Sequence, residues 1–217
     1  MNENGHFPPP WNLDGEGFLL PFWADKKHCL QSGFISESEK DSYRGGLGAV
    51  MLVNYRSSDV GPYFELLFIP GDFHHSGKTY KKITKIYVSS QKSVEEGILN
   101  WAIPKELAEF SWKKTDKETK IDIQSEKGSV LTTVLKEKFF SFPVTTSLFP
   151  FTLLQKAPES LLATKFIGKG SAKFAGLESY SSNPAHFPDI YSVSSFRLPG
   201  LAVSPFALTF PVPEVLK

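Results

Sequence analysis

The stretch AVMLVNYRSSDVGPYFELLFI, residues 49–69, decides the fold class of this 217-residue chain. Its first run, residues 49–55, is apolar enough for a strand that is buried on both faces. Its last run, residues 63–69, is similarly rich in aromatic and aliphatic residues. The Ser, Asp, Gly and Pro residues between the two runs are typical of a turn, so the stretch predicts a β-hairpin.

More strand-like segments lie on both sides of this hairpin. Downstream they are residues 82–90, the hairpin pair 120–124 and 129–135, two strands within 161–180 around a Gly168–Gly170 turn, and the closing segments 194–199 and 206–213. Upstream, the first 45 residues are largely irregular apart from residues 17–24. This segment is predicted as an edge strand because Pro21 cannot donate a ladder hydrogen bond.

One main helix is expected near residues 93–101. Ser93 and Glu96 have the spacing of a capping box, and Pro104 interrupts the helical pattern. Pro104 can also begin a second, short helix that continues to Phe110. Many short strands with one main helix predict a mainly β, α+β chain. We expect a single domain over residues 1–217, built as a closed or nearly closed antiparallel barrel or cone around an interior pocket.

Composition narrows the classes of partner and compartment. The 24 Lys and Arg residues nearly balance the 23 Asp and Glu residues, which argues against nucleic acid as a partner. One cysteine, Cys29, excludes an intramolecular disulfide and fits a reducing compartment. The N-terminal residues lack a secretion signal, and no apolar run approaches the roughly 20 residues of a membrane span. We therefore expect a soluble cytoplasmic protein with no membrane partner, and the sequence is compatible with a homo-oligomer.

The segment NWAIPKELAEF, residues 100–110, holds the strongest candidate for a reactive side chain, Lys105. A lysine is a nucleophile only when neutral, and burial among apolar residues lowers a lysine pKa. Trp101, Ile103 and Leu107 give Lys105 apolar neighbours in the chain. The structural alternative is a lysine at a helix start with its amine in solvent.

Other candidate side chains give weaker signals. His74 and His75 are adjacent, and adjacent side chains of an extended chain point apart, so they make a poor metal pair. Cys29 follows His28, but adjacency does not bring the thiol to the imidazole. Gly46–Gly48 and Gly168–Gly170 lack a phosphate-binding fingerprint. We expect neither a metal nor a cofactor.

Three segments resemble the acetoacetate decarboxylase superfamily, within a similarity that extends from about Pro10 to the C-terminus. They are GPYFELLFIPG (61–71), IYVSSQKSVEEGILNWAIPKELAEF (86–110), and FIGKGSAKFAG (166–176) with LTFPVPEV (208–215). The resemblance implies a β-rich cone around a pocket with a Schiff-base lysine. Lys105 matches that lysine, and Glu65 matches an acidic residue facing the pocket. Tyr63, Trp101 and Glu106 are the expected substrate-binding residues.

The chain also departs from the family pattern. Glu106 stands where the family has a second lysine, and an anion there would stabilise an ammonium in the same environment. Residues 15–24 contain no match for the family's pocket arginine, and residues 49–55 contain no second carboxylate.

Two functions follow from the resemblance. The first is an acetoacetate decarboxylase-like lyase that acts on a small β-keto or oxo acid by forming an imine between Lys105 and the substrate. The alternative is a divergent relative without decarboxylase activity, which catalyses another imine reaction, such as aldol condensation or dehydration, or binds a small apolar ligand. A structural or interaction module, the third option, has no positive sequence feature beyond its exposed prolines and ranks last.

Overall fold

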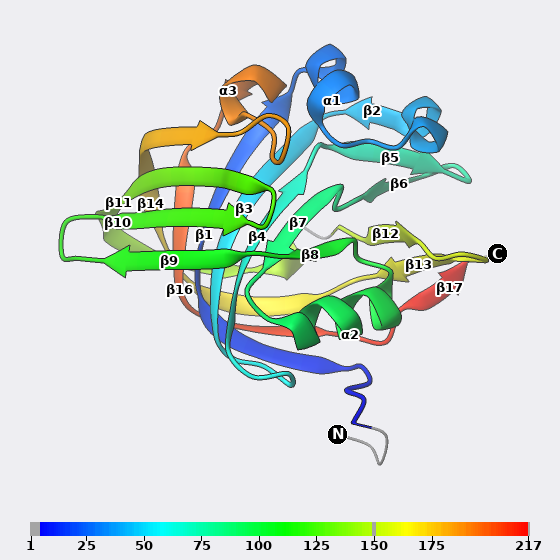
Figure 1. Ribbon diagram of the computed structural model, residues 1–217, viewed down its shortest axis with the longest axis horizontal. Helices are drawn as coiled ribbons and strands as arrows, with labels where there is room; N and C mark the ends of the chain where they lie inside the picture. The colour runs from blue at the N-terminus through cyan, green and yellow to red at the C-terminus, as the bar shows by residue number, and fades with distance from the viewer. Residues whose placement is uncertain (1–4, 149–150, 217) are drawn as a thin grey trace.

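The computed structural model describes residues 5–148 and 151–216 and is dominated by one strongly curved sheet. This eleven-stranded sheet has the order β8-β7-β4-β3-β1-β16-β14-β11-β10-β9, with β15 also paired to β1. Figure 1 shows it bent into a nearly closed barrel. The expected β-rich barrel is therefore confirmed.

The elements have the following bounds. The large sheet contains β1 (Trp11–Ala24), β3 (Leu47–Ser57), β4 (Tyr63–Ile69), β7 (Lys85–Val88), β8 (Lys105–Leu107), β9 (Glu109–Lys114), β10 (Thr119–Ser125), β11 (Gly128–Thr145), β14 (Ile167–Ser182), β15 (Ser194–Arg197) and β16 (Gly200–Phe210). A six-stranded sheet contains β2 (Tyr43–Gly45), β5 (Asp72–His75), β6 (Lys78–Lys81), β12 (Leu153–Lys156), β13 (Leu161–Thr164) and β17 (Glu214–Leu216). The helices are α1 (Lys26–Ser32), α2 (Gln91–Trp101) and α3 (Ile190–Val193), with 3₁₀ turns η1 (Glu37–Ser42) and η2 (Thr146–Leu148).

The two faces of the large sheet carry different cores, because side chains alternate between faces along a strand. One face, which we call the inner face, carries a hydrophobic cluster with residues from strands all around the barrel, including Phe18, Leu52, Leu66 and Ile121. The opposite face, which we call the outer face, carries a second hydrophobic cluster that includes Tyr55, Tyr63 and Trp101. Helices α1 and α3 lie together at one end of the barrel, whereas α2 covers the outer face beside β8 (Figure 1).

The predicted central hairpin is present as β3 and β4. The two strands pair antiparallel, with Val53 opposite Glu65 and Tyr55 opposite Tyr63. The predicted hairpin of β10 and β11 is also confirmed, with Ser125 opposite Gly128. None of the helices in the described part of the chain has both the length and the apolar character needed to cross a bilayer.

The prediction for the N-terminal segment was wrong. Residues 11–24 form β1, a central strand between β3 and β16 rather than an edge strand in an irregular region. Pro21 is tolerated because it lies where the neighbouring chain is interrupted between β15 and β16. At this interruption the Pro21 carbonyl accepts a hydrogen bond from the Leu198 N–H.

Two further local predictions were wrong. The residues after Pro104 form strand β8 instead of a short helix, because they pair in parallel with β7. The Gly168–Gly170 segment is not a turn but part of β14. A side chain at Gly170 would place a Cβ 2.8 Å from the Pro205 carbonyl oxygen, so this glycine allows β14 to lie close to β16.

The start of helix α2 also differs from the expected capping box. Ser90 is the N-cap, and its hydroxyl accepts a hydrogen bond from the Ser93 N–H. Ser93 lies inside the first turn, which leaves its own hydroxyl available for a different contact.

We predict that Gly15→Ala destabilises the barrel. A Cβ at Gly15 would lie 2.2 Å from the Asn54 carbonyl oxygen, so β1 and β3 would have to separate locally. Overpacking of this kind lowers the free energy of unfolding by about 1–3 kcal/mol, measurable by urea denaturation. Asp14→Ala, at an exposed neighbouring position, should change it by less than about 0.5 kcal/mol. An unchanged free energy for Gly15→Ala would contradict the close strand approach.

Candidate active site

Lys105 is placed on the outer face of the sheet by the turn that follows α2. Ala102 ends the helix in the left-handed conformation, with φ of 54°, and Ile103 and Pro104 lead directly into β8. Lys105 pairs in register with Ile86 of β7, whose side chain belongs to the outer cluster. Lys105 is only 7% exposed, so its amine lies in the core and not in solvent.

The amine of Lys105 has three neighbours in this core. Its Nζ donates to Glu65 Oε2 at 3.2 Å and to Ser93 Oγ at 3.0 Å. It also lies 5.2 Å from the centre of the Tyr63 ring. These contacts bring together residues from β4, α2 and β8. The predicted pair of Lys105 and Glu65 is thus close enough for direct proton exchange.

Helix α2 packs directly on the stem of the lysine. A Cβ added at Gly97 would lie 2.7 Å from Lys105 Cδ and 2.8 Å from its Cε. Gly97 and Ser93 are one helical turn apart and therefore share a face of α2. This face supplies both the space for the Lys105 stem and a hydroxyl for its amine.

Glu65 is 4% exposed and has a second partner, Tyr55, whose hydroxyl donates to Glu65 Oε1 at 3.1 Å. Burial is the main cause, and the charge of Glu65 the second, of a pKa well above the ordinary value for both Tyr55 and Tyr63. Both phenols therefore remain protonated at neutral pH. Tyr55 can donate a hydrogen bond to Glu65 without competing for its proton.

The other predicted site residues have different surroundings. Trp101 is 2% exposed in the outer cluster, and its indole N–H donates to the Pro211 carbonyl at 2.8 Å. Glu106 points to the opposite face of β8, where it pairs with Lys85 and lies 3.6 Å from Lys127. The structure brings Tyr63 to Lys105, but it does not bring Glu106 there.

Three residues of this site were not recognised in the sequence. Tyr55 joins it through the β3–β4 register, Ser93 through the helix start at Ser90, and Gly97 through its missing side chain. A period of two along the predicted hairpin could have indicated Tyr55, since Tyr55, Tyr63 and Glu65 are all odd-numbered positions of paired strands. The other two depend on how α2 packs, for which the sequence carries no signal.

The remaining titratable candidates lie elsewhere. Arg56 pairs with Glu16, Arg44 donates to the carbonyls of Asp41 and Tyr43, and Arg197 stacks on Tyr191. Among the described residues, no three His, Cys, Asp or Glu side chains form a group that could hold a metal. Burial raises the pKa of the Cys29 thiol to about 11, which leaves it unreactive.

The two buried tyrosines predict a specific loss of stability at high pH. Their folded-state pKa lies above the unfolded value of about 10, so they stabilise the fold fully below pH 10. This contribution is lost as the pH rises above 10, because the unfolded chain then releases these protons first. Denaturation midpoints between pH 8 and 11.5 should fall less steeply for a Tyr55→Phe/Tyr63→Phe variant than for the wild type. Tyr191→Phe, which changes an exposed tyrosine, is the control and should keep the wild-type pH dependence. A double variant whose midpoints fall as steeply with pH as those of the wild type would refute the raised pKa of Tyr55 and Tyr63.

Comparison with known proteins identifies the fold. No family model and no curated protein matches the sequence. Solved structures do match: acetoacetate decarboxylase from Legionella pneumophila has a TM-score of 0.75 and 14% identity, covering 97% of this chain and 88% of its own. The enduracididine biosynthesis enzyme MppR, complexed with pyruvate, has a TM-score of 0.71 and 12% identity, covering 100% and 93%. An acetoacetate decarboxylase-like enzyme from Sphingomonas wittichii has a TM-score of 0.69 and 11% identity, covering 97% and 94%.

These similarities extend over nearly the whole described barrel, and at 11–14% identity they are similarities of fold. They confirm, at that level, the resemblance found in the sequence. This chain has the fold of acetoacetate decarboxylase and the acetoacetate decarboxylase-like enzymes.

Proposed function

We propose that the protein is an acetoacetate decarboxylase-like lyase in which Lys105 forms an imine with a small β-keto or oxo acid. The observation that carries this proposal is the position of the Lys105 amine, which is buried in an apolar core with Glu65 at 3.2 Å. A structural lysine on a protein surface needs no such surroundings. A buried ionisable group held against a specific charged partner is a candidate for a functional site.

Glu65 is proposed as the proton carrier of the reaction. Transfer of a proton from the Lys105 ammonium to Glu65 leaves a neutral amine, which attacks the ketone carbon of the substrate. Glu65 then returns a proton to the departing hydroxyl, so that water leaves and the protonated imine forms. Tyr55 holds the second oxygen of Glu65 throughout, which keeps the carboxyl group oriented toward Lys105.

In decarboxylation, the bond between the α-carbon and the carboxylate breaks and its electron pair moves to the iminium nitrogen. Carbon dioxide leaves, and the enamine that remains takes a proton at carbon. Water then hydrolyses the imine, releasing the ketone and restoring the Lys105 amine. Each proton taken up or released in these steps can pass through Glu65.

The alternative is a different imine reaction, such as aldol condensation or dehydration, or the binding of an apolar ligand. It is favoured by the absence of an arginine contact to Lys105 or Glu65 among the described residues. In an imine reaction, a substrate carboxylate would then have the protonated imine at Lys105 as its cation. MppR, a structural neighbour, has been solved with the condensation product of pyruvate and imidazole 4-carboxaldehyde, which supports an aldol reaction as the alternative.

A cytoplasmic location is part of the proposal as well. The single cysteine, free and buried beside α3, supports a reducing compartment such as the cytoplasm.

Reductive trapping tests the imine directly. The protein is incubated with acetoacetate or pyruvate, reduced with borohydride, and digested for peptide mass analysis. We expect the added mass on Lys105, its absence from Lys105→Met, and its persistence in Lys113→Met, which changes an exposed strand lysine.

Release of carbon dioxide from acetoacetate separates the two reactions. Release with wild type, and loss by at least about a hundredfold in Lys105→Met, would establish the lyase. An adduct without release would favour the alternative imine reaction. A folded protein that gives no adduct with either compound would refute imine chemistry at Lys105.

A further inference from the structure

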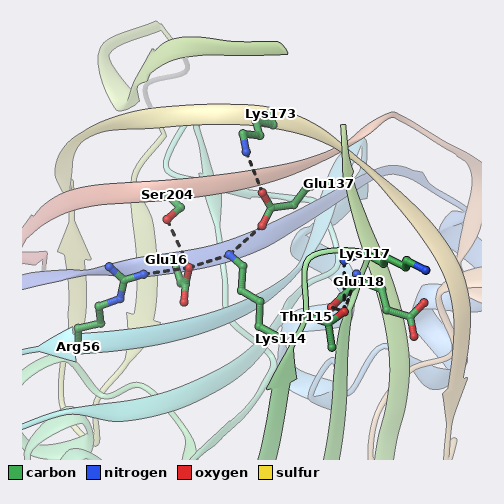
Figure 2. A network of polar contacts seen from close by, with 9 residues as sticks. All are labelled: Glu16, Arg56, Lys114, Thr115, Lys117, Glu118, Glu137, Lys173 and Ser204. Carbon is green, nitrogen blue, oxygen red and sulfur yellow. Dashed lines mark hydrogen bonds and ion pairs between the residues drawn. The ribbon is translucent and has the colours of Figure 1, made fainter. Parts of the chain in front are cut away.

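The inner face of the barrel carries a charged layer at the end away from α1 and α3. It consists of Glu16, Arg56, Lys114, Glu137, Lys173 and Ser204, each from a different strand of the large sheet (Figure 2). Lys114 of β9 contacts Glu16 of β1 at 3.0 Å and Glu137 of β11 at 2.8 Å. Since four strands lie between β1 and β9 in the sheet order, this contact crosses the barrel interior.

Hydrogen-bond donors in this layer outnumber the acceptors. A single carboxylate oxygen, Glu16 Oε2, accepts from Arg56 at 3.0 Å, from Lys114 at 3.0 Å and from Ser204 at 3.3 Å. Glu137 accepts from Lys114 and, at 3.2 Å, from Lys173 (Figure 2). Three cations thus share two carboxylates, and a guanidinium and two ammonium groups together offer far more donors than these contacts use.

The cations are also the exposed part of the layer. The side chains of Arg56, Lys114 and Lys173 are 56%, 41% and 42% exposed, whereas those of Glu16 and Glu137 are 12% and 24% exposed. Burial alone would raise the pKa of both carboxyl groups, but hydrogen bonds from the lysines and Arg56 outweigh it, so their pKa is lowered. The acids therefore remain ionised, and a molecule entering from solvent meets a surplus of one positive charge.

An aromatic surface lies next to this charged layer. Trp112 is two residues before Lys114 on the same face of β9. Its ring stacks on the rings of Phe18 and Phe64, with distances between ring centres of 6.0 Å and 5.7 Å. Phe64 also stacks on Phe110. Within the described part of the chain, the indole Nε1 of Trp112 is buried and has no hydrogen-bond partner. This donor without a protein partner belongs to the residue two positions before Lys114, on the same face of β9.

Backbone irregularities coincide with the charged layer. Arg56 is the extra residue of β3 between the pairs Tyr55–Gly15 and Ser57–Asp14. Ser204 lies in a similar shift of β16, and the pairing of β11 is interrupted directly after Glu137. Bulges redirect side chains and are frequent beside ligand sites. Three strands therefore depart from regular pairing at the point where these polar groups meet.

We propose that this end of the barrel binds a small organic anion with an aromatic body, such as an aryl carboxylate. Its carboxylate would accept from Arg56, Lys114 and Lys173, and its ring would lie against Trp112 and Phe64. The site is on the opposite face of the sheet from Lys105, so it is a second site that does not depend on the proposed imine chemistry.

The test uses phenylacetate, with acetate and phenylacetamide as partial probes. Calorimetry gives the affinity, and the indole N–H signals in ¹H–¹⁵N spectra report contact, with Trp112→Phe identifying the Trp112 signal. We expect phenylacetate to move the Trp112 signal and to bind more tightly than either partial probe. An unmoved signal at millimolar phenylacetate, or equal binding of the uncharged phenylacetamide, would overturn the proposal.

Substitutions locate the site. Arg56→Met and Lys173→Met leave Lys114 on both carboxylates, and each should weaken phenylacetate binding about tenfold, as expected for one lost hydrogen bond to a charged group. Lys113→Met, beside Lys114 but on the other face of β9, and Lys105→Met should bind like the wild type. Each comparison is made on a variant whose circular dichroism spectrum matches that of the wild type. Unchanged affinity in folded Arg56→Met and Lys173→Met, or loss of binding in folded Lys105→Met, would place the anion elsewhere and overturn the proposal.

Discussion

The contact between Lys105 and Glu65 is the interaction on which the arrangement of the outer core depends. Both side chains are at most 7% exposed, and ionised groups buried without partners are strongly destabilising. The surroundings compensate through Ser93, which accepts from the amine, and Tyr55, which donates to the carboxyl group. Helix α2 must therefore lie where Ser93 and Gly97 face the lysine, and the β3–β4 register must place Tyr55 opposite Tyr63. A one-residue slip of β4 would move Glu65 to the inner face.

The period of two along a strand also separates the two polar sites of the molecule. Lys105 points to the outer face, whereas its neighbour Glu106 points inward to Lys85. An anion directly after the candidate nucleophile therefore does not share its environment. In the same way, β1 turns Phe18 and Glu16 to the inner face and Leu13 to the outer face. One sheet can thus present an aromatic, cationic interior and a buried lysine on opposite sides.

The sequence predicted the features that depend on local pattern. The β3–β4 hairpin, the main helix and the pair of Lys105 and Glu65 were identified from residue patterns and from a family resemblance. The predictions for β1 and β8 were wrong because tertiary pairing overrode the local signals of Pro21 and Pro104. Pro21 is accommodated at a break in the neighbouring chain, and the residue after Pro104 pairs with β7. The contact of Ser93 with Lys105 and the crossing of Lys114 to Glu16 depend on distant packing, which local patterns do not encode.

A double-mutant cycle on Lys105 and Glu65 tests the central interaction most directly. The free energy of unfolding is measured for the wild type, Lys105→Met, Glu65→Gln and the double variant. If the two groups stabilise each other in the core, each single variant leaves a buried polar partner uncompensated. The double variant should then lose less than the sum of the single losses, with a coupling of about 1–3 kcal/mol. Additive losses, with a coupling near zero, would show that the two side chains do not interact and would contradict a paired active site.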